Sequence, residues 1–298
     1  MPEMTIGAPP SAAAKSRRRS QGPRTRATAL VGRVGLWVWI AASAVPIVFM
    51  VATSLKPQAL ALKIPPVWRF VPTAGNYKQV LTGSGGAPNI TPLLIHGVII
   101  TSVVTIITVI LGVSAGYALT IRTFRRRRFL SSWILSTYMF PGIVVVVPVF
   151  FFENGNGLLN TYPGIILPSL AVNLPIVVWL VRRGVNEIPL EVEEAAMLDG
   201  LSRAGLLRRI VLPLASPAIG ASIVVTGILG WNEDTFSLML TNSSTQPAPP
   251  AVLEFTGLYG TQWGLLCAAS VAIAAPAVLL ALVSRRRLVT GLTFGAVN

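Results

Sequence analysis

Long apolar runs constrain this chain more than any other feature of its sequence. Such runs lie at about residues 34–54, 95–120, 131–152, 164–181, 217–240 and 264–284. Each is close to the ~20 residues that an α-helix needs to cross the hydrocarbon core of a bilayer. Charged residues make up 11% of the chain, whereas a soluble domain of average composition contains roughly 25%. The sequence therefore predicts an all-α, polytopic membrane protein with six transmembrane helices.

Positive charge is concentrated between these runs. The net charge is +14, and arginines cluster at residues 17–19, 125–128 and 285–287. Basic segments beside apolar spans are typical of cytoplasmic loops, and this placement argues against nucleic acid as a partner. The N-terminal segment, the loops after the second and fourth runs, and the C-terminus carry 20 of the 24 Lys and Arg residues. This alternation predicts a multi-pass protein of the cytoplasmic membrane with both termini in the cytoplasm.

The first 33 residues differ in composition from the rest of the chain. They are rich in Ala, Ser, Pro and Arg and contain few large apolar residues. A segment of this kind cannot bury enough apolar surface to offset the entropy lost on folding. We expect residues 1–33 to form a disordered basic cytoplasmic tail and residues 34–298 to form the transmembrane domain.

The chain lacks the residues that several kinds of catalysis require. Cys267 is the single cysteine and His96 the single histidine, so we expect neither an intrachain disulfide nor a Cys/His metal site. A phosphate-binding P-loop needs Gly-Lys-Ser or Gly-Lys-Thr, and none of the four lysines follows a glycine. We therefore expect no catalytic residues, no metal and no cofactor in this chain.

The loop between the fourth and fifth runs, about residues 186–216, is the most informative segment. Pro189 suits the first turn of a helix, and the glutamates after it lie near the positive end of the helix dipole. Gly200 can adopt the left-handed conformation that ends helices, and Ser202 can cap a second helix that ends before Pro213. These residues predict two short helices. Such a unit either lies on the membrane as an amphipathic surface helix or projects from the bilayer to bind a partner.

The spacing in this segment resembles the EAA loop of ABC importer permeases. Glu194-Ala195-Ala196 is followed after three residues by Gly200, and after nine more by Ile210-x-Leu212-Pro213. In that family the loop forms a coupling helix that sits in a cleft of the ATPase subunit. The resemblance implies the ABC type I importer permease fold and a set of ATPase-coupling residues. The set comprises Glu193, Glu194, Ala195, Ala196, Asp199, Gly200, Ile210, Leu212 and Pro213.

Further motifs are similar to the sugar-permease branch of that family, and together they resemble the second permease subunit of maltose-type carbohydrate transporters. These motifs are Ser54–Pro57, Asn76-Tyr77, Gly157–Tyr162, Trp231–Glu233 and Gly291–Val297. The resemblance implies sugar import by alternating access through a heterodimeric pore formed with a second permease subunit. It also implies two separate ATPase subunits, which bind ATP and Mg, and an extracytoplasmic solute-binding protein.

Trp231, Asn232 and Glu233 are the candidate residues of the substrate pathway. An aromatic face with hydrogen-bonding neighbours suits a hydroxylated sugar ring. The structural alternatives are an interfacial Trp anchor and an interfacial carboxylate. Three other functions stay open: an ABC permease for a polyol, glycerol phosphate or peptide, an ion-coupled carrier, and a membrane scaffold or sensor. An ion-coupled carrier would need ionisable residues within the membrane, for which Glu153, Glu233 and Asp234 are the candidates.

Overall fold

The computed structural model describes residues 23–61, 63–121, 124–242, 244–257 and 260–293. The chain divides into two compact units, residues 1–49 and 50–298, and each is described by itself. The first unit holds most of helix α1 (Pro23–Ser54), whose stretch from Thr28 onward is long and apolar enough to cross a membrane.

Helix α1 begins earlier than the sequence predicts. We expected residues 1–33 to be a disordered tail, but residues 23–33 are helical, and residues 1–22 lie outside the described residues. Pro23 suits a first helical position, and the Ala, Leu and Arg residues that follow are good helix formers. Local helix propensity therefore extends the apolar span toward the N-terminus.

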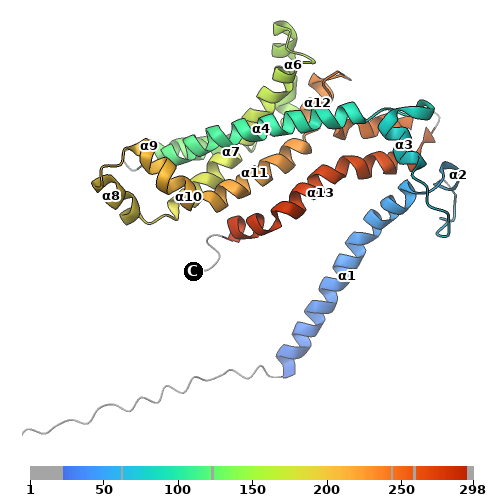
Figure 1. Cartoon of the computed structure of the whole chain (residues 1–298), viewed down its shortest axis with the longest axis horizontal. Coiled ribbons are helices and arrows are strands. Elements are labelled where there is room, and N and C mark those ends of the chain that lie inside the picture. Colours follow the sequence, from blue (N-terminus) through green and yellow to red (C-terminus); the bar gives the residue numbers. More distant parts are fainter. Residues whose placement is uncertain (1–22, 62, 122–123, 243, 258–259, 294–298) are drawn as a thin grey trace, which may run out of the picture. The chain divides into compact units, whose positions relative to one another are not determined.

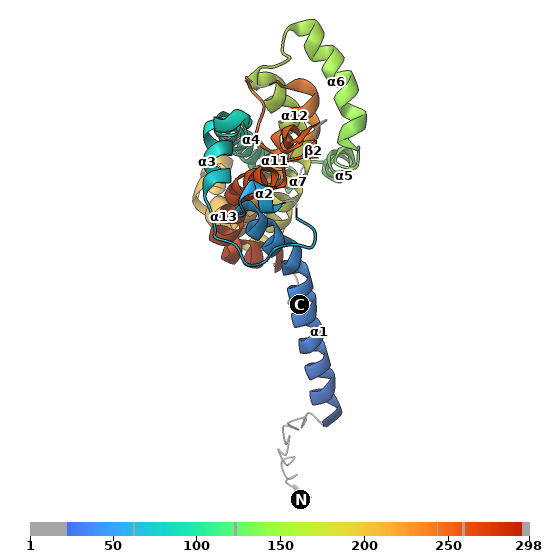
Figure 2. The ribbon, with the colours of Figure 1, turned by 90° about the vertical axis from the view of Figure 1, so that its right-hand side faces the viewer.

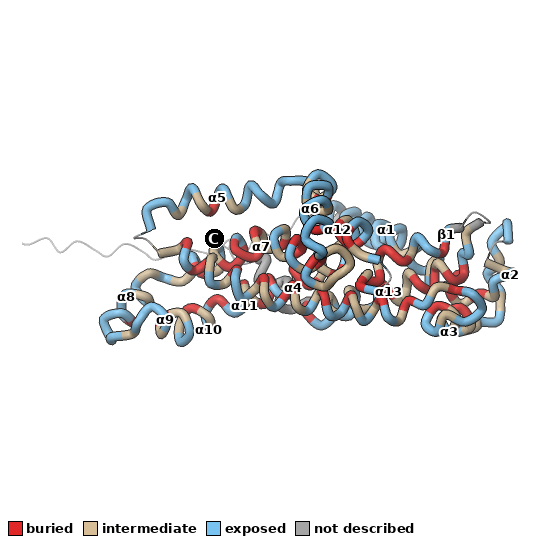
Figure 3. Tube along the Cα trace, turned by 90° about the horizontal axis from the view of Figure 1, so that it is seen from above, coloured by how far each residue is buried: buried red, intermediate tan, exposed pale blue. Residues whose placement is uncertain are grey.

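Four long helices run side by side in the second unit (Figures 1 and 2). They are α4 (Thr91–Ala118), α7 (Tyr162–Asn186), α11 (Ser216–Trp231) and α13 (Trp263–Thr293). Small residues let these helices approach closely, as is common between membrane helices. A Cβ atom added at Gly112 of α4 would overlap Val177 of α7, and one added at Gly184 of α7 would overlap Ala218 of α11. Buried residues lie along these four helices, whereas α5 (Arg127–Thr137), α6 (Gly142–Asn156) and α8 (Leu190–Leu198) are mostly exposed (Figure 3).

Two of the predicted spans are broken rather than continuous. The run at about 131–152 forms α5 (Arg127–Thr137) and α6 (Gly142–Asn156), which are bent by 87° at their junction. Pro141 in this junction is extended (φ −62°, ψ 131°), and its missing N–H cannot continue a helix. The run at about 217–240 stops at Trp231 and resumes as α12 (Thr235–Leu240). Among the described residues, four helices could cross a membrane by themselves, or up to six if bent pairs count as single spans.

The segments at the two ends of the bundle are short (Figure 1). One end carries α8 (Leu190–Leu198), α9 (Arg203–Leu206), the π-helical turn η2 (Leu207–Val211) and α10 (Leu212–Leu214). The opposite end carries α2 (Gln58–Ala61), α3 (Gly75–Thr82), η1 (Ser84–Gly86), η3 (Pro249–Phe255) and the strands β1 (Thr256–Gly257) and β2 (Gly260–Thr261). The two-residue antiparallel pair is a small exception to the predicted all-α fold.

Candidate coupling site and solute pathway

Residues 186–216, named here the coupling segment, fold as the two short helices that the sequence predicts. Pro189 precedes α8 in an extended conformation, and Glu191 and Glu193 occupy the first turn, where acidic side chains interact favourably with the helix dipole. Helix α8 ends before Gly200, which has a φ of +85°. This left-handed conformation is open to glycine but strained for a side chain with a Cβ atom. The sharp turn between the two helices therefore depends on a glycine at this position.

The second helix starts as predicted but ends differently. The Ser202 hydroxyl oxygen accepts a hydrogen bond from the N–H of Gly205 (3.2 Å), which caps α9. We expected this helix to stop before Pro213, but helical structure continues through η2 and α10 and then bends by 75° into α11. Proline in a helix lacks an N–H and crowds the carbonyl four residues earlier. The wider π turn at Leu207–Val211 makes room for Pro213 without ending the helix.

An apolar cluster fastens the coupling segment to the membrane helices. Ala196 of α8, Leu206 of α9 and Val211 of η2 are buried in this cluster. They pack with buried residues of the long helices α4 and α7, among them Tyr117 and Val181. Because a packed apolar core resists rearrangement, this cluster attaches α8 firmly to α4 and α7.

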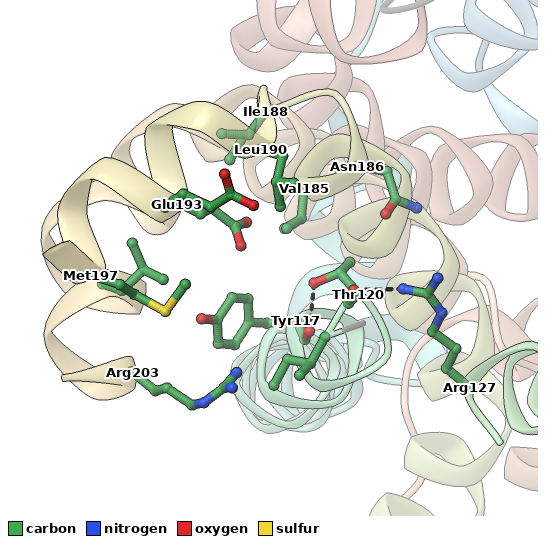
Figure 4. A pocket seen from close by; sticks show the side chains of 13 residues that line it. Tyr117, Thr120, Arg127, Val185, Asn186, Ile188, Leu190, Glu193, Met197 and Arg203 are labelled. Atoms are coloured by element: carbon green, nitrogen blue, oxygen red, sulfur yellow. Dashed lines mark hydrogen bonds between the residues drawn. The ribbon is translucent and has the colours of Figure 1, made fainter. Parts of the chain in front are cut away.

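A pocket of about 450 Å³ lies between the coupling segment and the ends of α4 and α7 (Figure 4). Glu193 and Arg203 point into it from α8 and α9, and the Tyr117 hydroxyl points toward them from α4. Arg127 of α5 donates a hydrogen bond to the carbonyl oxygen of Thr120 (3.0 Å) beside the same pocket. The polar groups of four elements thus meet behind α8, on its bundle-facing side.

The other side of α8 is open. Leu198 has 89% of its surface exposed. Ala195, Asp199 and Gly200 are also exposed, and so is Glu194, which in addition lines the pocket behind α8. A second hollow of about 430 Å³ lies on the coupling segment, between α8 and Ile210. The predicted coupling residues are therefore divided between an anchored face, which includes Ala196, and an exposed face.

The structure adds two residues to those predicted for the coupling segment. Leu198 on the exposed face was missed because an apolar residue in an amphipathic helix is normally expected to be buried. Tyr117, which belongs to the apolar cluster, lies some seventy residues earlier in the chain, and no local pattern connects it to α8. The remaining predicted residues Leu212 and Pro213 lie in α10, where they lead into α11.

The three candidate pathway residues have different surroundings. Trp231 is buried, and its Nε1 donates a hydrogen bond to the carbonyl oxygen of Ile273 in α13 (3.0 Å). The Glu233 carboxylate accepts hydrogen bonds from the N–H groups of Phe236 (2.9 Å) and Ser237 (3.3 Å), so it caps α12. Asn232 is exposed, and its Nδ2 donates a hydrogen bond to the carbonyl oxygen of Ile228 (2.8 Å). All three residues thus have structural partners, and substrate contact by them stays a prediction.

Comparison with known proteins decides the family. Residues 108–290 match the protein family described as the binding-protein-dependent transport system inner membrane component. This region includes the coupling segment, the α5–α6 junction and the α11–α12 junction. The chain belongs to this family. It is a transmembrane permease component of an ABC importer and a non-catalytic subunit.

The relatives of this permease are transport proteins of similar length. The trehalose transport system permease protein SugB of Mycobacterium tuberculosis is 32% identical over 256 residues, covering 85% of this chain and 92% of the relative. The trehalose/maltose transport system permease protein MalG of Thermococcus litoralis is 33% identical over 255 residues, covering 85% and 91%. The diacetylchitobiose uptake system permease protein DasC of Streptomyces coelicolor is 28% identical, covering 85% and 91%.

Solved structures support the fold of the permease. A chain of a bacterial ABC transporter that imports the acidic polysaccharide alginate superposes with a TM-score of 0.68 at 20% identity, covering 89% of this chain and 98% of that one. A chain of the inward-facing methionine transporter MetNI superposes with a TM-score of 0.51 at 18% identity, covering 67% and 96%. The predicted ABC importer permease fold is confirmed.

Proposed function

We propose that this permease imports a sugar, with the coupling segment receiving the movement of an ATPase subunit. The observation that carries the proposal is the division of α8 into two faces. Ala196 and its neighbours are fixed to α4 and α7, whereas Leu198 and the Glu194-Ala195 pair are exposed. A helix that is anchored on one side and exposes both acidic side chains and the apolar Leu198 on the other suits insertion into a cleft of a partner.

The sugar assignment is supported by the relatives. Two of those described above are named for trehalose or maltose and one for diacetylchitobiose. At about 30% identity they share most of the length of this chain. We therefore propose a sugar or short oligosaccharide as the transported solute.

We also propose the other subunits of the transporter and their roles. A second permease subunit completes the pore as a heterodimer, and an extracytoplasmic solute-binding protein delivers the sugar. Two ATPase subunits bind ATP and Mg, and one of them docks on the coupling segment. Both termini of this chain lie in the cytoplasm. ATP binding favours one orientation of the pore and hydrolysis resets it, since the ATPase contacts differ between the two states.

Reconstitution tests this proposal. The permease is purified with its second permease, its ATPase and its binding protein, and uptake of labelled trehalose and maltose into proteoliposomes is measured. ATP-dependent uptake of either sugar is expected. Uptake of neither sugar, with uptake of a peptide or polyol instead, would overturn the sugar assignment, and uptake without any ATPase would overturn the coupling assignment.

A charge reversal tests the docking surface separately. Glu194→Lys is expected to reduce ATPase retention in a pull-down by more than ~10-fold, since reversing a charge at an interface costs several kcal/mol. Glu254→Lys is the control, because Glu254 is also exposed but lies in η3 at the opposite end of the bundle. Equal retention by the two variants would contradict docking on α8.

A further inference from the structure

Two of the helix breaks in the part of the chain that the structure describes lie beside each other. We name the segments Thr137–Gly142 and Trp231–Thr235 the paired breaks. A Cβ atom at Gly142 would lie 3.8 Å from the side chain of Thr235. The helices that leave the two breaks also pack together, because Val146 of α6 shares a buried cluster with Phe236 and Leu240 of α12. Two segments almost a hundred residues apart in sequence thus interrupt helices at neighbouring positions in the structure.

This place lies within the membrane-spanning length of the bundle. The Trp231 ring reaches to 3.1 Å from the position of a Cβ atom at Gly97, which is roughly 9 Å along α4 from its first residue at 1.5 Å per residue. The same ring is hydrogen-bonded to Ile273, roughly 15 Å along α13 from its first residue. The paired breaks are therefore below the ends of the spanning helices and not in an external loop.

Irregular and polar backbone at this depth restricts what can surround it. Non-helical backbone within a membrane is tolerated only where protein covers it or where it lines a water-filled cavity. Protein of this chain does not cover the breaks fully, because Asn232 and Asp234 are exposed. A carboxylate facing lipid below the helix ends is unfavourable, with a cost that reaches about 3 kcal/mol at the bilayer centre. The Asn232 Nδ2 already donates a hydrogen bond to the carbonyl oxygen of Ile228 (2.8 Å). In the pore that the second permease subunit completes, water or a solute in water satisfies the remaining polar groups.

Aromatic side chains complete the chemistry at the paired breaks. Tyr138 and Phe140 in the first break are 39% and 64% exposed. Aromatic faces beside amide and carboxylate groups suit a sugar ring, because its C–H faces stack on aromatic rings while its hydroxyls form hydrogen bonds.

We propose that the paired breaks form this chain's wall of the solute pathway, with Tyr138, Phe140, Asn232 and Asp234 as its contact residues. The nature of the solute rests on the proposed function. Trp231 and Glu233 then act as positioning residues: Trp231 anchors the end of α11 to α13, and Glu233 caps α12. Of the three pathway residues that the sequence predicts, only Asn232 is among the proposed contact residues.

Thiol labelling tests the location without needing a known substrate. The single native cysteine is removed by Cys267→Ser, which gives a background for Tyr138→Cys and Asn232→Cys. Ile110→Cys on α4 and Leu279→Cys on α13 are matched controls, because both positions are exposed and apolar. In the assembled transporter, a charged, water-soluble methanethiosulfonate is expected to label positions 138 and 232 at least ~10-fold faster than the controls, because thiolates form in water and not in lipid. Equal rates at all four positions would overturn the proposal.

Transport measurements test the contact role. In proteoliposomes, Asn232→Ala and Asp234→Asn are expected to raise the KM for the transported sugar by ~5-fold or more, since each lost hydrogen bond to a solute costs about 1 kcal/mol or more. Trehalose and maltose at saturating concentration are expected to slow labelling of Tyr138→Cys. Unchanged KM and unchanged labelling would overturn the contact assignment. If the wild-type transporter imported neither sugar while the Tyr138→Cys and Asn232→Cys variants were labelled fast, only the proposed solute would be refuted.

Discussion

The coupling segment and the paired breaks are both interruptions between helices, but they are built in opposite ways. The coupling segment is anchored on one side: a capped α9, a left-handed Gly200 and an apolar cluster fix its shape and attach it to α4 and α7. The paired breaks are open, with exposed aromatic and polar side chains such as Phe140 and Asn232. A segment that transmits force needs rigid attachment, whereas a segment that meets a moving solute needs accessible groups.

The largest expected effect concerns the turn of the coupling segment. Gly200→Val places a β-branched side chain at a φ of +85°, a strain of order 1–3 kcal/mol. The turn is expected to reorganise, so that sugar uptake falls by more than ~10-fold while ATP hydrolysis by the complex continues, and membrane insertion is unchanged. Uptake and ATP hydrolysis in the same proteoliposomes check this uncoupling.

Gly200→Asn sharpens the test, because asparagine tolerates the left-handed region better than other non-glycine residues. It is expected to keep more uptake than Gly200→Val. If both variants transported at the wild-type rate, the rigid turn would not be required for coupling.

A smaller effect is expected at the paired breaks. Glu233→Ala removes the carboxylate that accepts two N–H groups of α12, and loss of such a cap costs about 1–2 kcal/mol. We expect the thermal midpoint of the purified complex to fall by a few degrees, with a smaller fall for Glu233→Gln, whose amide oxygen can still accept a hydrogen bond. Equal midpoints for Glu233→Ala and wild type would show that Glu233 does not stabilise the break.

The smallest effect is expected at the cap of α9. Ser202→Ala removes the acceptor for the Gly205 N–H and is expected to cost about 1 kcal/mol. Ser132→Ala is the control, because Ser132 is an exposed residue within α5. A thermal melt should place Ser202→Ala below this control, and the reverse order would argue that the cap contributes nothing to the coupling segment.

The sequence predicted most accurately what depends on neighbours in the chain. The apolar spans, the left-handed turn at Gly200 and the cap at Ser202 follow from local composition and from the backbone preferences of single residues. The bend at Pro141 did not, since a proline in a membrane helix is compatible with a slight kink as well as an 87° bend. The same limit applies to Pro213, which the helix accommodates by a π turn.

Long-range contacts account for the remaining differences. Trp231 was interpreted as an interfacial anchor or a sugar platform because its sequence neighbours are polar. Its partner is the carbonyl of Ile273, forty-two residues away, and no pattern in the sequence indicates that pairing. The proximity of the two helix breaks is likewise a property of the packed bundle.

The most direct test of the account asks where the exposed face of α8 lies and what it touches. In the Cys267→Ser background, Leu198→Cys places a thiol at the most exposed of the large apolar residues of α8. A membrane-impermeant maleimide is predicted to label it in inside-out vesicles but not in right-side-out vesicles. A bifunctional maleimide is predicted to join it to the ATPase subunit. Labelling from the extracellular side, or no cross-link to the ATPase in a transport-active complex, would contradict the proposed coupling.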